Sequence, residues 1–189
     1  MRLRDRLVLW ARRLTGRVPG WRYRGQSRPP FAAEPGPGQE SVWDYPRPPC
    51  LAPDERRVEV RAAGAVLART HRAIRVLETA SPPTFYIPPD DVDMQRLQVV
   101  PGASFCEWKG AATYWGLRDD PDAGFVGWSY EHPLPAFAAI RGHLAFYPDR
   151  LECRVNGEIA RGQGGRFYGG WITSEVVGPF KGEPGTGDW

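Results

Sequence analysis

The chain has 189 residues, of which 41% are hydrophobic and 25% charged, and this composition predicts one globular domain. Its net charge of +3 is unevenly distributed: residues 1–39 carry nine arginines and two acids, whereas the remainder is mildly acidic. An acidic body argues against a broad nucleic-acid surface on it. No signal-peptide pattern and no apolar run long enough to span a membrane occur, so we expect a cytoplasmic protein.

The first 39 residues form a basic arm and linker. Apolar residues recur at helical spacing within residues 3–14, which predicts an amphipathic helix: Leu3, Leu7, Trp10, Ala11 and Leu14. Residues 1–14 then either contact a membrane surface or a protein partner, or are a frayed extension. Residues 19–40 are rich in Pro, Gly and Arg, which predicts a flexible linker.

From residue 40 onward, short apolar segments alternate with turn residues, and this pattern predicts a mostly β domain over residues 40–160. We expect strands near residues 58–60, 66–68, 74–77, 84–87, 97–100, 104–108, 112–115, 125–130, 143–147 and 151–155. Residues 135–141 predict one short helix, and Asn156-Gly157 predicts a tight turn. A Gly-rich C-terminal extension follows over residues 161–189.

Several motifs in fixed order resemble the bacterial domain-of-unknown-function 427 family across about residues 40–160. They are ESVWDYPRPP (40–49), RVLET (75–79), YIP (86–88), CEWKGAATYW (106–115), GWSY (127–130), GHLAFY (142–147) and NGE (156–158). The resemblance implies a β-tent-like fold, a pair of small antiparallel sheets. It implies little about activity, because one fold hosts many functions.

The family sometimes carries a nucleotidyltransferase label, but the residues give that chemistry little support. Nucleotidyl transfer needs acids that hold Mg²⁺ and a Gly-rich turn for the phosphates. Asp91 and Asp93 have alternating spacing, but they follow two prolines, and no glycine occurs between Gly64 and Gly102. We interpret this segment as a turn that starts a short helix.

No metal site and no cofactor are predicted. Zinc sites usually bring cysteines and histidines together in close pairs. The three cysteines and three histidines of this chain are all isolated in the sequence: Cys50, Cys106, Cys153, His71, His132 and His143.

Cys106 and Lys109 are the most suggestive pair of chemical groups. A lysine three residues from a thiol could activate it as a nucleophile, or Cys106 could be an inert buried residue beside a turn. Glu78 is an acid among apolar neighbours, and it could act as a general acid or base or pair with Arg75 or Lys109.

We predict that aromatic and charged side chains converge on one concave ligand-binding site. Its expected members are Trp43, Tyr45, Glu78, Cys106, Lys109, Tyr114, Trp128 and Tyr130. The first hypothesis is therefore a small-molecule-binding β domain whose ligand the sequence does not identify. The alternatives are an enzyme, transferase or thiol-based, that uses Cys106 or the Glu78–Lys109 pair, and a scaffold docked through its basic N-terminal helix.

Overall fold

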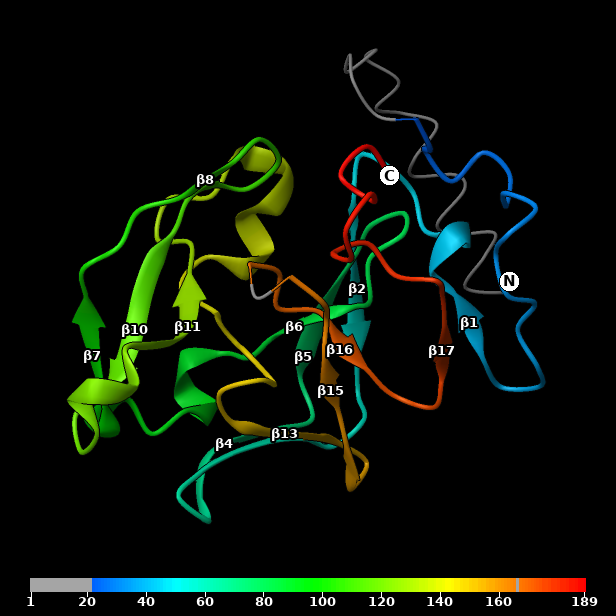
Figure 1. Ribbon diagram of the computed structural model, residues 1–189. Helices are drawn as coiled ribbons and strands as arrows, with labels where there is room; N and C mark the ends of the chain where they lie inside the picture. The colour runs from blue at the N-terminus through cyan, green and yellow to red at the C-terminus, as the bar shows by residue number, and fades with distance from the viewer. Residues whose placement is uncertain (1–21, 166) are drawn as a thin grey trace.

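The computed structural model describes residues 22–165 and 167–189 (Figure 1). The predicted helix within residues 3–14, and any membrane or partner contact that it makes, lie outside the described residues. Within the described ranges, no helix is long and apolar enough to cross a membrane. The prediction of a mostly β chain is confirmed, since small sheets and short 3-10 helices make up the described elements.

Three sheets form the body, and all three are antiparallel. The first has the order β12 (Leu144–Phe146), β11 (Phe125–Ser129), β10 (Thr113–Leu117) and β7 (Leu97–Val100). The second has the order β14 (Glu158–Ile159), β13 (Glu152–Val155), β3 (Val58–Ala62) and β4 (Ala65–Thr70). The third has the order β2 (Cys50–Asp54), β5 (Ala73–Leu77) and β6 (Thr84–Tyr86).

Three two-stranded pairs complete the sheet structure. Two are antiparallel: β8 (Phe105–Cys106) with β9 (Gly110–Ala111), and β15 (Arg161–Gly162) with β16 (Trp171–Ile172). The third is parallel and joins β1 (Glu40–Ser41) to β17 (Val176–Val177), so the start of the body is paired with the C-terminal extension.

The helices among the described residues are short 3-10 turns. They are η2 (Val42–Asp44), η3 (Pro89–Asp91), η4 (Met94–Arg96), η5 (Pro121–Ala123) and η6 (Pro135–Ile140). The last lies where we expected the short helix, and η3 and η4 lie where we expected the turn at Asp91 and Asp93 to start a helix. The predicted tight turn is also confirmed, since Asn156 and Gly157 have φ values of 49° and 88°.

The first and third sheets are joined by a backbone bridge. The N–H of Ile87, just after β6, donates to the carbonyl of Leu144 at 2.8 Å, and the N–H of Leu144 donates back at 2.9 Å. This bridge brings the ends of β6, β11 and β12 together. Tyr86, Trp128 and Tyr147 from these segments therefore share one apolar cluster.

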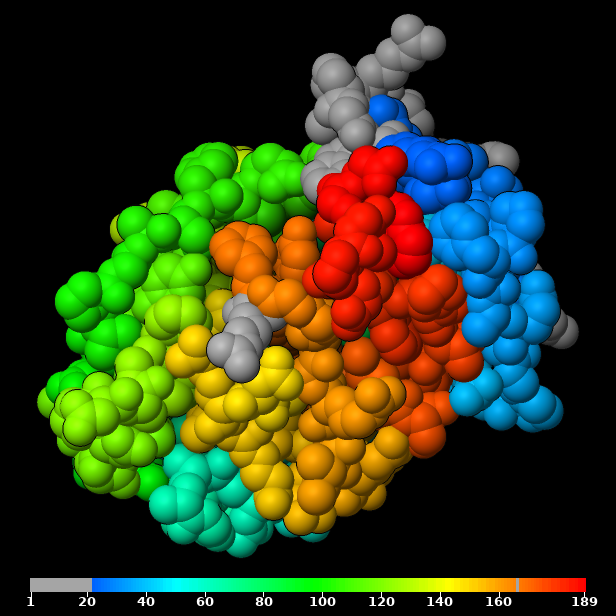
Figure 2. Space-filling model, viewed as in Figure 1, coloured from blue at the N-terminus to red at the C-terminus, as the bar shows by residue number. Residues whose placement is uncertain are grey.

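Residues 22–39 pack on the body instead of forming the separate linker that we expected. Tyr23 and Phe31 make edge contacts with Trp43 at centroid distances of 5.2 Å each, and Phe31 stacks on Trp189 at 5.2 Å. Arg28 pairs with Asp44 at 2.7 Å. Figure 2 shows the C-terminal residues (red) lying against this N-terminal segment (blue). Aromatic rings that are far apart in the sequence therefore hold residues 22–39 against Trp43 and the C-terminal Trp189.

Candidate functional site

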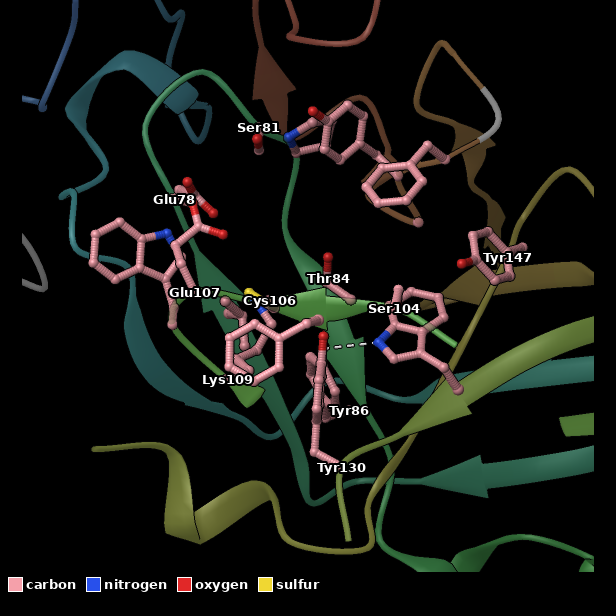
Figure 3. Close-up of a pocket in the computed structure, with 18 of the residues that line it drawn as sticks. Glu78, Ser81, Thr84, Tyr86, Ser104, Cys106, Glu107, Lys109, Tyr130 and Tyr147 are labelled. Atoms are coloured by element: carbon pink, nitrogen blue, oxygen red, sulfur yellow. Dashed lines mark hydrogen bonds between the residues drawn. The ribbon is translucent and has the colours of Figure 1, made fainter. Parts of the chain in front are cut away.

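A cavity of about 210 Å³ opens between the first and third sheets (Figure 3). Twenty residues line it: Val76, Glu78, Ser81, Pro82, Thr84, Tyr86, Ser104, Phe105, Cys106, Glu107, Trp108, Lys109, Tyr114, Trp128, Tyr130, Tyr147, Phe167, Tyr168, Gly169 and Lys181. Five of the seven tyrosines and both lysines of the chain are in this set. The cavity therefore has aromatic walls and charged groups of both signs.

Strand alternation determines which aromatic rings face the cavity. Tyr114 on β10 pairs directly with Trp128 on β11, and both rings belong to the cavity wall. Trp115, the next residue along β10, packs on the opposite side against the main core and donates its indole N–H to Ser129 at 2.8 Å. Trp128 donates its own N–H to the hydroxyl of Tyr86 at 3.2 Å.

The turn between β8 and β9 supplies the reactive groups of the site. Cys106 ends β8, Gly110 starts β9 with φ of 100°, and Lys109 lies between them. That positive φ suits glycine, so the Lys-Gly step closes this tight hairpin. The turn places the Cys106 thiol and the Lys109 ammonium side by side in the cavity wall (Figure 3).

Lys109 stays charged although it is deeply enclosed. Burial lowers the pKa of Lys109, but its electrostatic interactions with Cys106, Tyr130 and Glu78 together raise it above its ordinary value. The ammonium also lies 6.0 Å from the ring centre of Tyr130 and 5.7 Å from that of Phe137, within the range of cation–π attraction. Lys109 is thus a fixed positive charge beside a sulfur atom.

The other two cysteines have different environments. Cys50 lies in the cluster beneath the N-terminal segment, and burial raises the pKa of its thiol to about 12. Cys153 lies in the main core, where burial raises its thiol pKa well above the ordinary value. Neither residue lines the cavity, so Cys106 is the cysteine exposed to whatever enters it.

A second group of charges surrounds Glu78. Pairing of Glu78 with Arg75 or Lys109 was one of the alternatives that the sequence left open, but the ion pair that Glu78 forms is with Arg47, whose Nε donates to Oε1 at 3.0 Å. Arg75 pairs instead with Glu40 and Asp54. Arg75 points away because neighbouring strand residues face opposite sides of the sheet.

Lys181 reaches the same end of the cavity from the C-terminal extension. Burial, and then the positive charge of Arg47, lower the pKa of Lys181 to about 8, although Glu78 and Glu107 oppose this shift. Its ammonium donates to the main-chain oxygen of Trp189 at 2.9 Å. The extension therefore contributes a cation whose protonation is sensitive to the charges around it.

The extension also forms one wall of the cavity. Gly169 lies so close to Trp128 that an added Cβ would be 2.2 Å from the indole ring. Phe167 and Phe105 line the cavity and are 66% and 73% exposed. These two exposed rings lie at the cavity rim, where a bound molecule would reach them.

Six of the eight predicted site residues line the cavity: Glu78, Cys106, Lys109, Tyr114, Trp128 and Tyr130. Trp43 and Tyr45 lie elsewhere, buried in the cluster formed with the two chain ends, where Trp43 donates to the carbonyl of Pro179 and Tyr45 to Glu40. Trp43 is buried because the rings of Tyr23 and Trp189 pack against it.

Sequence reasoning missed several members of the wall: Glu107, Tyr147, Tyr168 and Lys181. The sequence did contain one clue to Lys181. The chain has only two lysines among its 25 lysine and arginine residues, and the other one is Lys109. Asp91, whose spacing with Asp93 suggested a metal site, accepts hydrogen bonds from Thr70 and Arg72 at the end of η3. Within residues 22–165 and 167–189, no group of three or more His, Cys, Asp and Glu side chains is placed to hold a metal ion.

A family model described as a domain of unknown function (DUF427) matches residues 50–157. The chain belongs to the DUF427 family. This confirms the resemblance seen in the motifs. No curated protein matches the chain. The matched DUF427 region contains the hairpin with Cys106 and Lys109, whereas Arg47 and the extension residues of the cavity lie outside it.

Proposed function

We propose that this DUF427 protein binds a compact small molecule in the cavity. The observation that carries the proposal is the placement of both lysines and five of the seven tyrosines on one concave surface. The remaining lysine and arginine residues of the chain are all arginines. Arginine is suited to flat ion pairs with several hydrogen bonds. Lysine supplies a compact ammonium on a flexible stem, and that group suits contact with an anionic or carbonyl oxygen of a ligand.

The size and walls of the cavity restrict the ligand. A volume of about 210 Å³ is below the roughly 300–1,000 Å³ of pockets that hold drug-sized molecules, so the ligand is smaller than those. Trp128, Tyr130 and Tyr114 offer ring faces and edges to a flat or apolar body. A metabolite with one small ring and polar substituents meets both conditions.

The polar groups of the site would orient such a ligand. The buried indole N–H of Trp108 has no acceptor within the described residues, and a ligand oxygen would satisfy it. Lys109 is a fixed positive charge, Glu78 is a carboxylate held by Arg47, and Tyr114 donates to Ser104 at 2.8 Å. We assign the anionic or carbonyl end of the ligand to Lys109 and its donor end to Glu78.

A thiol-based enzyme is a second candidate, favoured by the contact between Lys109 and Cys106. A positive charge beside a sulfur favours the thiolate, which is the nucleophilic form. Such an enzyme would lose activity in Cys106→Ser but keep ligand binding. The scaffold hypothesis depends on residues 1–14, which lie outside the described residues, and nothing in the described part favours it.

A thermal-shift screen of the full chain tests the proposal. The compounds are small ring-bearing metabolites with a carboxylate, phosphate or carbonyl group, and a ligand at 100 times its Kd adds about 2.7 kcal/mol of stability. Each hit is repeated on Phe105→Ala, at the cavity rim, and on Ile159→Ala, another exposed apolar residue that does not line the cavity. We expect weaker binding only in Phe105→Ala; identical shifts in both variants, or no hit at all, would contradict the proposal.

A further inference from the structure

Cys106 differs from the other two cysteines in access, charge environment and neighbours. It is half-buried and lines the open cavity, whereas Cys50 and Cys153 are 2% and 0% exposed within separate apolar clusters. All three cysteines of the chain lie among the described residues, so this comparison includes every thiol. A reagent that enters the cavity therefore meets one thiol.

The neighbours of Cys106 favour reaction at its sulfur. The Lys109 ammonium lies beside the sulfur on the same turn. A cation in that position favours reaction at sulfur, because the thiolate is the form that oxidants and electrophiles attack. Burial raises the pKa of Tyr130 and of Tyr86 above the ordinary value, so both phenols keep their protons and act as donors at the same wall. This set of a thiol, an ammonium and two phenols lies in one small cavity.

We propose that Cys106 is a peroxide-sensitive modification site, oxidised to a sulfenic acid, and that Lys109 is the positioning residue that makes it reactive. The thiolate sulfur attacks one oxygen of a hydroperoxide, an S–O bond forms and the O–O bond breaks. The departing oxygen takes the Lys109 proton and leaves as water or an alcohol. Sulfur is oxidised, the peroxide is reduced, and Lys109 becomes a neutral amine.

No second thiol of the chain lines the cavity, so an internal disulfide does not remove the product. A disulfide would need Cys50 or Cys153, and each is enclosed in a different cluster from Cys106. The added oxygen also occupies part of a cavity of only about 210 Å³. Oxidation by peroxide would thus change which molecules fit into the cavity. The oxidation of Cys106 does not itself depend on whether the cavity binds a ligand.

The test treats the reduced full chain with hydrogen peroxide in the presence of dimedone, which traps sulfenic acids, and maps the adducts by peptide mass spectrometry. We expect the adduct on Cys106, with the Cys50 and Cys153 peptides unmodified until the protein is denatured. Iodoacetamide should show the same selectivity, since it reads thiolate reactivity without oxidation. Absence of labelling at Cys106, or equal labelling of all three cysteines, would overturn the proposal.

Two lysine variants separate a positioning role for Lys109 from a general charge effect. Lys109→Met should slow labelling of Cys106 at neutral pH by about tenfold, the change expected when one charge contact beside a thiolate is lost, and Lys109→Arg should restore most of the rate. Arg118→Met removes an exposed positive charge that does not line the cavity, and it should change the rate by less than about twofold. Equal effects of the two methionine variants would refute the assigned role. Protection of Cys50 and Cys153 from labelling reports whether each variant is folded. If Lys109→Met does not fold, the selective labelling of Cys106 in the wild-type protein decides the proposal.

Discussion

Arg47 and Glu78 form an ion pair behind the cavity wall, in which Nε of Arg47 donates to Oε1 of Glu78 at 3.0 Å. Only 1% of the Arg47 side chain is exposed, against 20% of the Glu78 side chain. The same guanidinium donates to the carbonyls of Tyr23 at 3.0 Å and Thr79 at 2.7 Å. Arg47 therefore links the N-terminal segment to the loop that carries the cavity carboxylate.

Replacing Arg47 should destabilise the protein strongly. Arg47→Met leaves a carboxylate and two carbonyls without their donor, and breaking a buried pair in this way costs about 3–5 kcal/mol. Urea denaturation of wild type and variant measures the difference. Arg47→Lys keeps the positive charge but lacks the several N–H donors of the guanidinium, so its loss of unfolding free energy should be intermediate. A loss below about 1 kcal/mol for Arg47→Met would show that the contacts of Arg47 are dispensable.

The strands of the body could be predicted because local alternation determines them. The apolar segments near residues 97–100, 125–130 and 151–155 became β7, β11 and β13 with bounds shifted by one residue or less. Strand alternation is a short-range property, since each side chain faces opposite to its neighbours. Six site residues followed from the same local patterns, above all from the Cys106–Gly110 turn.

The remaining features depend on contacts between distant parts of the chain. Arg47 reaches Glu78 across 31 residues, and no local pattern favoured it over Arg75. Trp43 looked like a cavity residue because its loop carries an acid, but rings from Phe31 and Trp189 enclose it. Gly-rich sequence near residue 169 predicted an extension without indicating that it would pack on Trp128.

Removing residues 1–39 should lower the melting temperature, in contrast to what the linker interpretation implies. Tyr23 and Phe31 each contact Trp43, and aromatic pairs of this kind contribute about 0.5–1.5 kcal/mol each beyond burial. Thermal unfolding of the full chain and of a chain starting at Glu40 measures the effect. Phe31→Ala should reproduce part of the loss, whereas Val99→Ala, an exposed residue of β7, should not. Equal melting temperatures for all four proteins would show that the segment adds no stability.

Glu59 on β3 should make stability depend on pH in acid. Hydrogen bonds from Arg61, and also from Arg57 and Arg69, lower the pKa of Glu59 to about 2, from an ordinary value of 4.5. A lowered carboxyl pKa stabilises the folded state above the unfolded-state value, and this contribution is lost as pH falls from about 4.5 to about 2.

Glu59→Gln tests this assignment. At pH 7 the variant should lose about 1–3 kcal/mol of unfolding free energy, because Arg57, Arg61 and Arg69 lose the carboxylate that they share. Below pH 3 the difference from wild type should shrink toward zero, because the wild-type carboxyl is then being protonated in both states. Denaturant curves at several pH values measure both effects. A difference that stays constant across this pH range would mean that the ion pairs of Glu59 do not account for it.

Gly169→Ala should detach the extension from the cavity wall. A Cβ at this position would be 2.2 Å from the Trp128 ring, and that ring is held on its other side by Tyr86 and by Tyr147 at a centroid distance of 4.6 Å. These contacts hold the indole in place, so we expect the loop carrying Phe167 and Tyr168 to move outward.

Gly187→Ala is the matched control for Gly169→Ala, because an added Cβ at Gly187 meets nothing within 4 Å. The readout is collisional quenching of tryptophan fluorescence by acrylamide, together with the rate at which iodoacetamide labels Cys106. Both should rise in Gly169→Ala, since Trp128 and the cavity become more accessible to solvent, and both should match wild type in Gly187→Ala. If Gly169→Ala also matches wild type, the extension does not close the cavity, and the assignment of Tyr168 and Lys181 to its wall fails.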